Sequence, residues 1–101
     1  MLGAIAGDII GSVHEFSRNE DQKFPLFAER SCPTDDSLLT WAVAETILRG
    51  ERDYKPRLVG MLGYYEKNCQ HATLPAAFGG GFSDWVYDGA KGERNSFGNG
   101  S

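Results

Sequence analysis

The residues best suited to chemistry in this chain are three consecutive oxygen-bearing side chains, Thr34, Asp35 and Asp36, which directly precede an apolar run. If Thr34 caps a helix, the two carboxylates fall in its first turn, where the helix dipole favours each by about 0.3 to 1 kcal/mol. That explanation suffices for a helix start in solvent. If the helix is buried, adjacent carboxylates need further neutralisation, and a hydroxyl with two carboxylates suits Mg2+. Local chemistry leaves both capping and metal binding open.

A second pair of acids lies near the N-terminus. Glu15 follows Asp8 by seven residues, or two helical turns, so that one helix would present both on the same face. One of them could act as a general acid or base, and the other as a fixed carboxylate, if both border the same cavity. The alternative, which the residues alone favour, is that Asp8 caps or hydrogen-bonds locally and Glu15 is solvated. His14 is a weak signal and is more typical of a surface or satisfied histidine than of a ligand.

Two glycine-rich stretches, FGGGF at 78–82 and SFGNG at 96–100, could each turn backbone N–H groups toward phosphate oxygens. Neither has the Gly-Lys-Ser/Thr ending of a Walker loop, and neither follows a strand. Taken alone, each is better explained as a turn. The terminal Gly-Asn-Gly-Ser is equally consistent with a frayed tail and with a loop that leads into a helix.

In this order, the stretches GAIAGDIIGSVHEF, TDDSLLT and SFGNGS resemble the N-terminal part of the ADP-ribosylglycohydrolase family, which includes the dinitrogenase reductase-activating glycohydrolases. The resemblance runs from Gly3 to Ser101. It implies an all-helical domain whose central cleft holds two Mg2+ or Mn2+ ions and an ADP-ribose unit. It also implies that the substrate is an ADP-ribosylated protein or a small molecule containing ADP-ribose, and that the reaction is hydrolysis of the glycosidic bond.

The resemblance also implies roles for individual residues. Thr34, Asp35 and Asp36 look like the first group of metal ligands, and Glu15 looks like the glutamate near the scissile bond. The contacts to ribose and diphosphate would come from Ser96, Gly98, Asn99, Gly100 and Ser101.

Family members are longer than this chain, and a second acidic motif of the Asp-x-Asp-Thr type completes their metal site. No such motif follows Asp36 here. The resemblance therefore implies that residues 1–101 form the N-terminal portion of a single, incomplete domain with half of the metal ligands. We expect it to self-associate or to need a complementing chain. A non-catalytic helical interaction module is the alternative function.

Length and composition limit the number of domains and the kinds of partner that can be expected. The chain has 101 residues, enough for one domain, and its net charge of -4 comes from ten basic and fourteen acidic residues without a basic stripe. Neither nucleic acid nor an anionic membrane is therefore expected as a partner. The N-terminus lacks a basic region and meets Asp8 too early for a signal peptide or a membrane span, which makes the cytoplasm the expected location. Cys32 and Cys69 are expected to be reduced and to serve in packing.

Helices alone are expected to position these residues. Apolar spacing predicts a helix over 2–13, in which Gly3, Gly7 and Gly11 form a smooth strip for close packing against another helix. Residues 16–32 lack a sustained period and predict a long connection. No alternating strand pattern persists, so that the expected class is all-α.

The residues that start and stop a helix are clearest around the acidic motif formed by Thr34, Asp35 and Asp36. Pro33 and Thr34 mark the start of a mostly buried helix that stops at Gly50. Its expected core stripe consists of Leu38, Leu39, Ala42, Val43, Thr46 and Ile47. A third helix is predicted over 53–67, with Leu58, Met61, Leu62 and Tyr65 on its inner face. A fourth is predicted over 83–88, capped by Ser83 and ending near Gly89.

Overall fold

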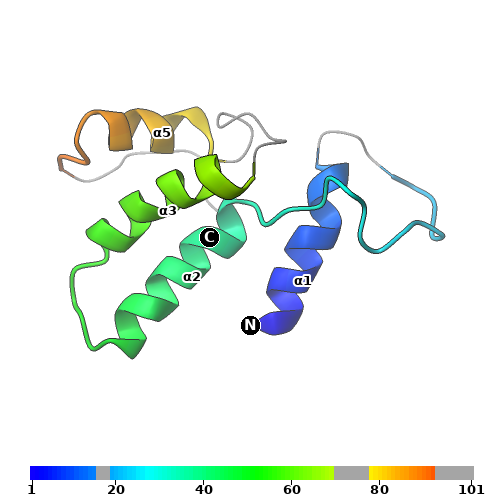
Figure 1. Cartoon of the computed structure of the whole chain (residues 1–101), viewed down its shortest axis with the longest axis horizontal. Coiled ribbons are helices and arrows are strands. Elements are labelled where there is room, and N and C mark those ends of the chain that lie inside the picture. The colour runs from blue at the N-terminus through cyan, green and yellow to red at the C-terminus, as the bar shows by residue number, and fades with distance from the viewer. Residues whose placement is uncertain (16–18, 70–77, 93–101) are drawn as a thin grey trace.

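A computed structural model of the chain describes residues 1–15, 19–69 and 78–92, and within these ranges all regular structure is helical (Figure 1). The elements are α1 (Leu2–Gly11), a short 3-10 helix η1 (Ser12–His14), α2 (Asp35–Leu48), α3 (Lys55–Asn68) and α5 (Gly80–Tyr87). This confirms the all-α class. In the described part of the chain, no helix has both the length and the apolar character needed to cross a membrane.

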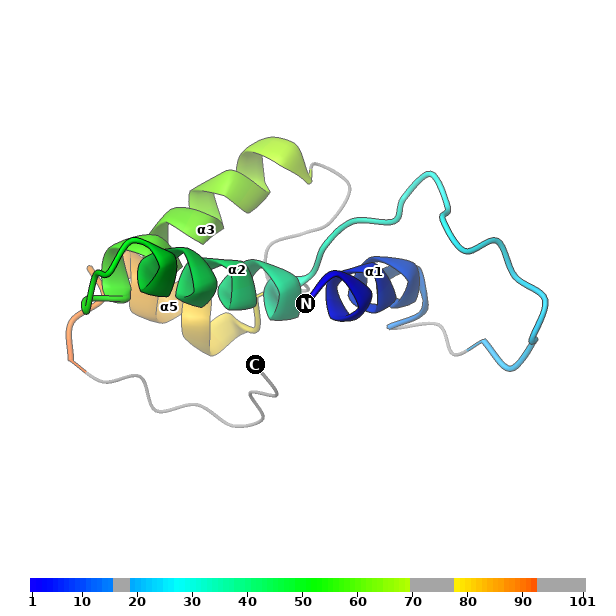
Figure 2. The same ribbon diagram turned by 90° about the horizontal axis from the view of Figure 1, so that it is seen from below.

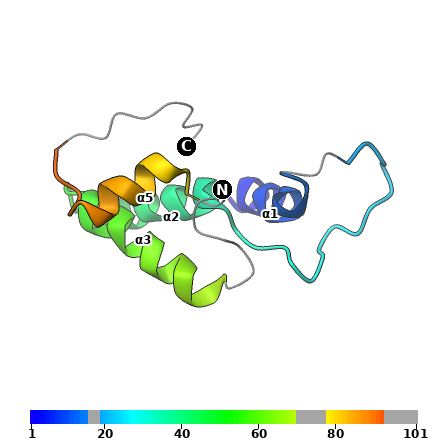
Figure 3. The same ribbon diagram turned by 90° about the horizontal axis from the view of Figure 1, so that it is seen from above.

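The hydrophobic core lies among α2, α3 and α5. Helices α2 and α3 run side by side in opposite directions, and α5 packs beside them (Figures 1 and 3). The buried cluster consists of Leu38, Leu62, Tyr65, Cys69, Phe78 and Phe82. Cys69 is thus a packing residue, as expected, and both cysteines are free thiols.

Helix α1 stands apart from this core. It contacts α2, but none of its ten residues is buried, and Leu2 is 85% exposed. Figure 2 shows α1 beside the start of α2, with the connection that precedes α2 extending away from the core. The expected close packing of Gly3, Gly7 and Gly11 is wrong for the described residues, because a Cβ at any of them would meet nothing within 4 Å.

Helix α2 begins and ends where the sequence predicts. Thr34 is its N-cap, and Gly50 follows the C-cap with a φ of +69°, a conformation that favours glycine. The prediction that the helix is mostly buried is wrong. Its buried residues are Ser37, Leu38, Ala42 and Thr46. Val43 and Ile47 are exposed because α3 covers only one side of α2.

The inner face of α3 is confirmed. Leu62 and Tyr65 are buried, and Leu58 and Met61 pack partly buried against the same cluster.

The start of α5 differs from the prediction. The helix begins at Gly80 with Gly79 as its N-cap, so that Ser83 lies inside the helix, buried, and not at its start. The additional turn brings Phe82 onto Phe78, with the two rings stacked at a centroid distance of 5.2 Å. Burial of these aromatic rings outweighs the low helix propensity of the glycines. The predicted end near Gly89 is confirmed, since Gly89 has a φ of +80°.

Candidate functional site

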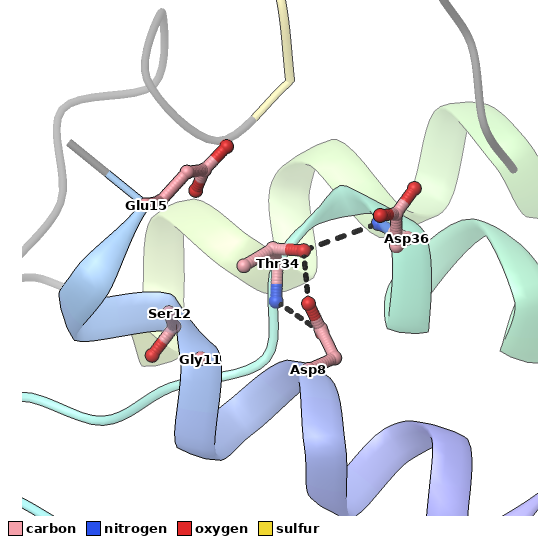
Figure 4. A pocket seen from close by; sticks show the side chains of 6 residues that line it. All are labelled: Asp8, Gly11, Ser12, Glu15, Thr34 and Asp36. Carbon is pink, nitrogen blue, oxygen red and sulfur yellow. Dashed lines mark hydrogen bonds between the residues drawn. The ribbon is translucent and has the colours of Figure 1, made fainter. Parts of the chain in front are cut away.

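The acidic motif at the start of α2 is tied directly to α1. Asp8 accepts two hydrogen bonds from Thr34: the backbone N–H donates to Oδ2 at 2.8 Å, and the hydroxyl donates to Oδ1 at 2.5 Å (Figure 4). The two residues are 26 positions apart in the chain. The interpretation of Asp8 as a locally bonded residue is therefore wrong, because its carboxylate crosses from one helix to the beginning of another.

Thr34 also caps α2. Its Oγ1 accepts a hydrogen bond from the backbone N–H of Asp36 at 3.4 Å. The capping interpretation is thus confirmed, and it does not compete with metal binding. A hydroxyl has one proton and two lone pairs. With the proton donated to Asp8 and one lone pair facing Asp36 N, the second lone pair has no partner among the hydrogen bonds of the described residues.

An open pocket of about 230 Å3 lies where α1, η1 and the start of α2 meet. Its lining residues are Asp8, Gly11, Ser12, Glu15, Thr34 and Asp36 (Figure 4). Three residues predicted from the sequence, Glu15, Thr34 and Asp36, therefore border the same cavity. Asp35 does not line it but follows Thr34 directly in the first turn of α2. The other predicted contacts, Ser96, Gly98, Asn99, Gly100 and Ser101, fall outside the described residues.

The pocket concentrates negative charge, and none of its six lining residues is basic. Burial, together with the neighbouring charge of Asp36 and the weaker effects of Glu15 and Asp8, raises the pKa of Asp35 to about 6. Glu15 is exposed, as the alternative expected, but partial loss of solvent around its carboxyl and the charges of Asp8 and Asp36 still raise its pKa. The charges of Asp8 from α1, Glu15 from the end of η1 and Asp36 from α2 thus all act on the Asp35 carboxyl.

The donor atoms fit a hard cation in kind but do not form a closed cage. Thr34, Asp35 and Asp36 offer only oxygen, the donor that Mg2+ and Mn2+ prefer. Across residues 1–15, 19–69 and 78–92, however, no group of three or more His, Cys, Asp or Glu side chains is arranged to hold a metal ion.

Sequence reasoning missed two connections between α1 and the segment that leads into α2. One is the Asp8–Thr34 pair, and the other involves Ser12, whose Oγ donates to the carbonyl of Ile9 at 2.8 Å and accepts from Cys32 N at 3.2 Å. The available signal was spacing, since Asp8, Ser12 and Glu15 recur at intervals that place them on one helical face.

The expectation of a surface or satisfied histidine is wrong for His14, because its Nε2 is buried and has no hydrogen-bond partner among the described residues. Its ring packs edge-on against Phe24, with a centroid distance of 5.1 Å, and it does not line the pocket.

Comparison of the chain with protein-family models, with curated proteins and with solved structures finds no match in any of the three. The fold and the site themselves define an all-helical protein with an open acidic pocket between α1 and the N-terminus of α2.

Proposed function

We propose that this chain carries half of the active site of a metal-dependent hydrolase of the ADP-ribosylglycohydrolase type. The substrate would be an ADP-ribosylated protein or a small molecule that contains ADP-ribose, and the reaction would take place in the cytoplasm. The observation that supports the proposal is that Glu15 and the motif of Thr34 and Asp36 border one pocket, although a long connection separates them in the sequence.

Thr34, Asp35 and Asp36 would provide the oxygen ligands on this side of a site for Mg2+ or Mn2+. The ions, two in the complete site, would act as a Lewis acid and as a template that holds the ribose hydroxyls. The charges of these residues favour cation binding. Asp35 and Asp36 repel one another in a partly buried position, and a bound cation would relieve that repulsion.

Glu15 would serve as the proton-transferring residue. A carboxyl group whose pKa is raised by burial and by neighbouring acids holds its proton closer to neutral pH, where it can give and recover it during hydrolysis. Its place at the end of η1 puts it at the rim of the same pocket as Asp36. Asp8 is engaged by Thr34 and is the poorer candidate for this role.

The remaining ligands would come from another chain, or from a second copy of this one, and would close the site from the opposite side. The open form of the pocket leaves room for ligands from such a partner.

The direct test is binding of ADP-ribose to the chain in the presence of Mg2+, followed by NMR. We expect shifts in the amide signals of α1 and of the start of α2 that require the divalent ion and are lost in Asp36→Asn. Glu29→Gln is the matched control, because it removes one carboxylate from an exposed position outside the pocket. If ADP-ribose causes no shift in the presence of Mg2+, the proposal is wrong.

A second candidate function is that of a non-catalytic module that associates with a second copy of itself. It is favoured by the large apolar side chains at the surface: Leu2 is 85%, Leu48 87% and Ile47 59% exposed. Of these, Ile47 and Leu48 are consecutive at the end of α2, and contiguous exposed apolar surface is typical of interaction sites. This candidate predicts that sedimentation experiments find a stable dimer. The substitution Leu48→Glu should dissociate this dimer, and neither Mg2+ nor ADP-ribose should affect it. A monomer at all concentrations would exclude it.

A further inference from the structure

The pair formed by Asp8 and Thr34 uses every donor that Thr34 has. Its backbone N–H and its hydroxyl both donate to the Asp8 carboxylate, one to each oxygen. A side chain with two acceptor oxygens is required for this arrangement, and an ionised carboxylate is acceptor-only. Asp8 thereby fixes the rotation of the Thr34 hydroxyl, which would otherwise be free to turn.

The direction of the hydroxyl proton decides what Thr34 can offer to a cation. When the proton points at Asp8, the oxygen presents a lone pair elsewhere, and a hydroxyl oxygen binds a cation only through a lone pair. When the proton points into the pocket, its partial positive charge repels a cation. The two residues both line this pocket, so that the choice is made at the site itself.

We infer that Asp8 is a positioning residue for the cation site: by taking the hydroxyl proton of Thr34, it keeps a Thr34 lone pair available to the metal. This inference rests on the proposed function, because it assumes that Thr34 is a ligand. Asp8 acts through Thr34 and need not touch the metal. Residues that orient ligands in this way typically contribute about 10- to 100-fold to metal affinity.

Asp8→Asn is the informative variant. An amide has one acceptor oxygen and one NH2 group, and it cannot accept from both the N–H and the hydroxyl of Thr34. If its oxygen accepts from the Thr34 N–H, its NH2 donates to Oγ1 and consumes the lone pair. Asp8→Asn also removes a negative charge near the site, and this direct effect on a cation has to be separated from the effect through Thr34.

A double-mutant cycle separates the two effects. The probe is Mn2+ added to the 101-residue chain, because paramagnetic broadening of the amide signals near Asp35 and Asp36 detects weak binding. We expect Asp8→Asn to raise the Mn2+ concentration for half-broadening by about tenfold or more. In a Thr34→Val background, which lacks the hydroxyl, adding Asp8→Asn should have a much smaller effect, since the group on which Asp8 acts is gone.

Control measurements separate a loss of Mn2+ affinity from a loss of folding. Circular dichroism and the dispersion of the amide spectrum show whether each variant is folded, and Thr34→Ser, which keeps the hydroxyl, should retain affinity close to that of the wild type. Glu29→Gln gives the effect of removing one exposed charge outside the pocket.

The outcomes are distinct. If the wild-type chain shows no broadening near α2, the proposed function fails, and this inference fails with it. If the wild type binds Mn2+ but Asp8→Asn weakens binding equally with and without the Thr34 hydroxyl, only the inference fails, because Asp8 then acts through its charge alone. A Thr34-dependent loss supports it.

Discussion

Ser12 and Cys32 are joined by a hydrogen bond in which the backbone N–H of Cys32 donates to the Ser12 hydroxyl at 3.2 Å. Two residues later, the N–H of Thr34 donates to Asp8 at 2.8 Å. Residues four apart on a helix are separated by about 6 Å along its axis, which nearly matches the roughly 6.6 Å that two residues span in an extended chain. Asp8 on α1 and Ser12, the C-cap of that helix, therefore hold the incoming chain at two points.

Ser12→Ala should destabilise the fold by about 1 kcal/mol, because the partly buried N–H of Cys32 loses its acceptor. The free energy of unfolding in urea, followed by circular dichroism, measures the loss.

Ser83→Ala provides the matched control for this prediction. The Ser83 hydroxyl is buried inside α5, and its oxygen has no hydrogen-bond partner within the described ranges. Replacing it with alanine removes a costly buried polar group and improves helix propensity, so that we expect a gain of about 0.5 to 1 kcal/mol. Losses of equal size in the two variants would mean that the hydrogen bond to Cys32 contributes nothing specific.

The sequence predicted those features that depend on neighbouring residues. The boundaries of α2 follow from a threonine cap and a glycine terminator, which act within one turn. It did not predict the start of α5, because the glycines there are outweighed by contacts between Phe78 and Phe82 that no local rule contains. The exposure of Val43 depends likewise on which side of α2 the third helix covers.

The candidate site also has a part that the local sequence predicts and a part that it does not. Thr34 and Asp36 were predicted as site residues because their oxygen-bearing side chains lie close together in the sequence. The hydrogen bonds that Thr34 donates to Asp8 were not predicted, because they depend on how the connection before α2 returns the chain to α1. Periodicity places Asp8 and Glu15 on one face but does not say what that face meets.

Replacing Gly50 and Gly63 with alanine should change the stability of the chain in opposite directions. Gly50 has a φ of +69° and donates its N–H to the carbonyl of Ile47 at 2.9 Å, so that Gly50→Ala should cost about 1 kcal/mol. Gly63 lies exposed inside α3, where a Cβ meets nothing within 4 Å. Gly63→Ala should therefore stabilise the chain by about 0.5 to 1 kcal/mol. Thermal melts of the two variants test the pair, and shifts in the same direction would contradict it.

Phe78 should be among the most sensitive positions of the core. It is 1% exposed and packs edge-on against Tyr65 with a ring-centroid distance of 5.4 Å. Phe78→Ala should cost about 3 to 5 kcal/mol, a large part of the total stability of a small domain. Phe27, which is 63% exposed, supplies the control, since Phe27→Ala should change the unfolding free energy by less than about 0.5 kcal/mol. Similar losses in both variants would mean that Phe78 is not part of the core.

The stability of the metal-free chain should fall as the pH rises through the titration of Asp35. Its pKa lies at about 6 in the folded chain against an ordinary value of 3.8, because of burial and the neighbouring charges of Asp36, Glu15 and Asp8. The folded state therefore binds more protons than the unfolded state between these values, and stability decreases with increasing pH across that window. Glu15, whose pKa is also raised, contributes with the same sign.

Asp35→Asn should remove most of this pH dependence. At pH 7 we expect the variant to be more stable than the wild type by about 1 kcal/mol, after allowance for solvent screening at a partly exposed site, and at pH 4 the difference should vanish. Urea unfolding at a series of pH values measures both chains, with Glu29→Gln as a control that removes an exposed carboxylate. Because a bound divalent ion favours the ionised carboxylate, added Mg2+ should reverse the order at pH 7 and stabilise the wild type but not Asp35→Asn. The opposite result would be a wild-type stability that rises between pH 4 and 6 without metal, while that of Asp35→Asn does not rise. It would show that the fold stabilises the charged form of Asp35, and it would contradict the electrostatic description of the pocket.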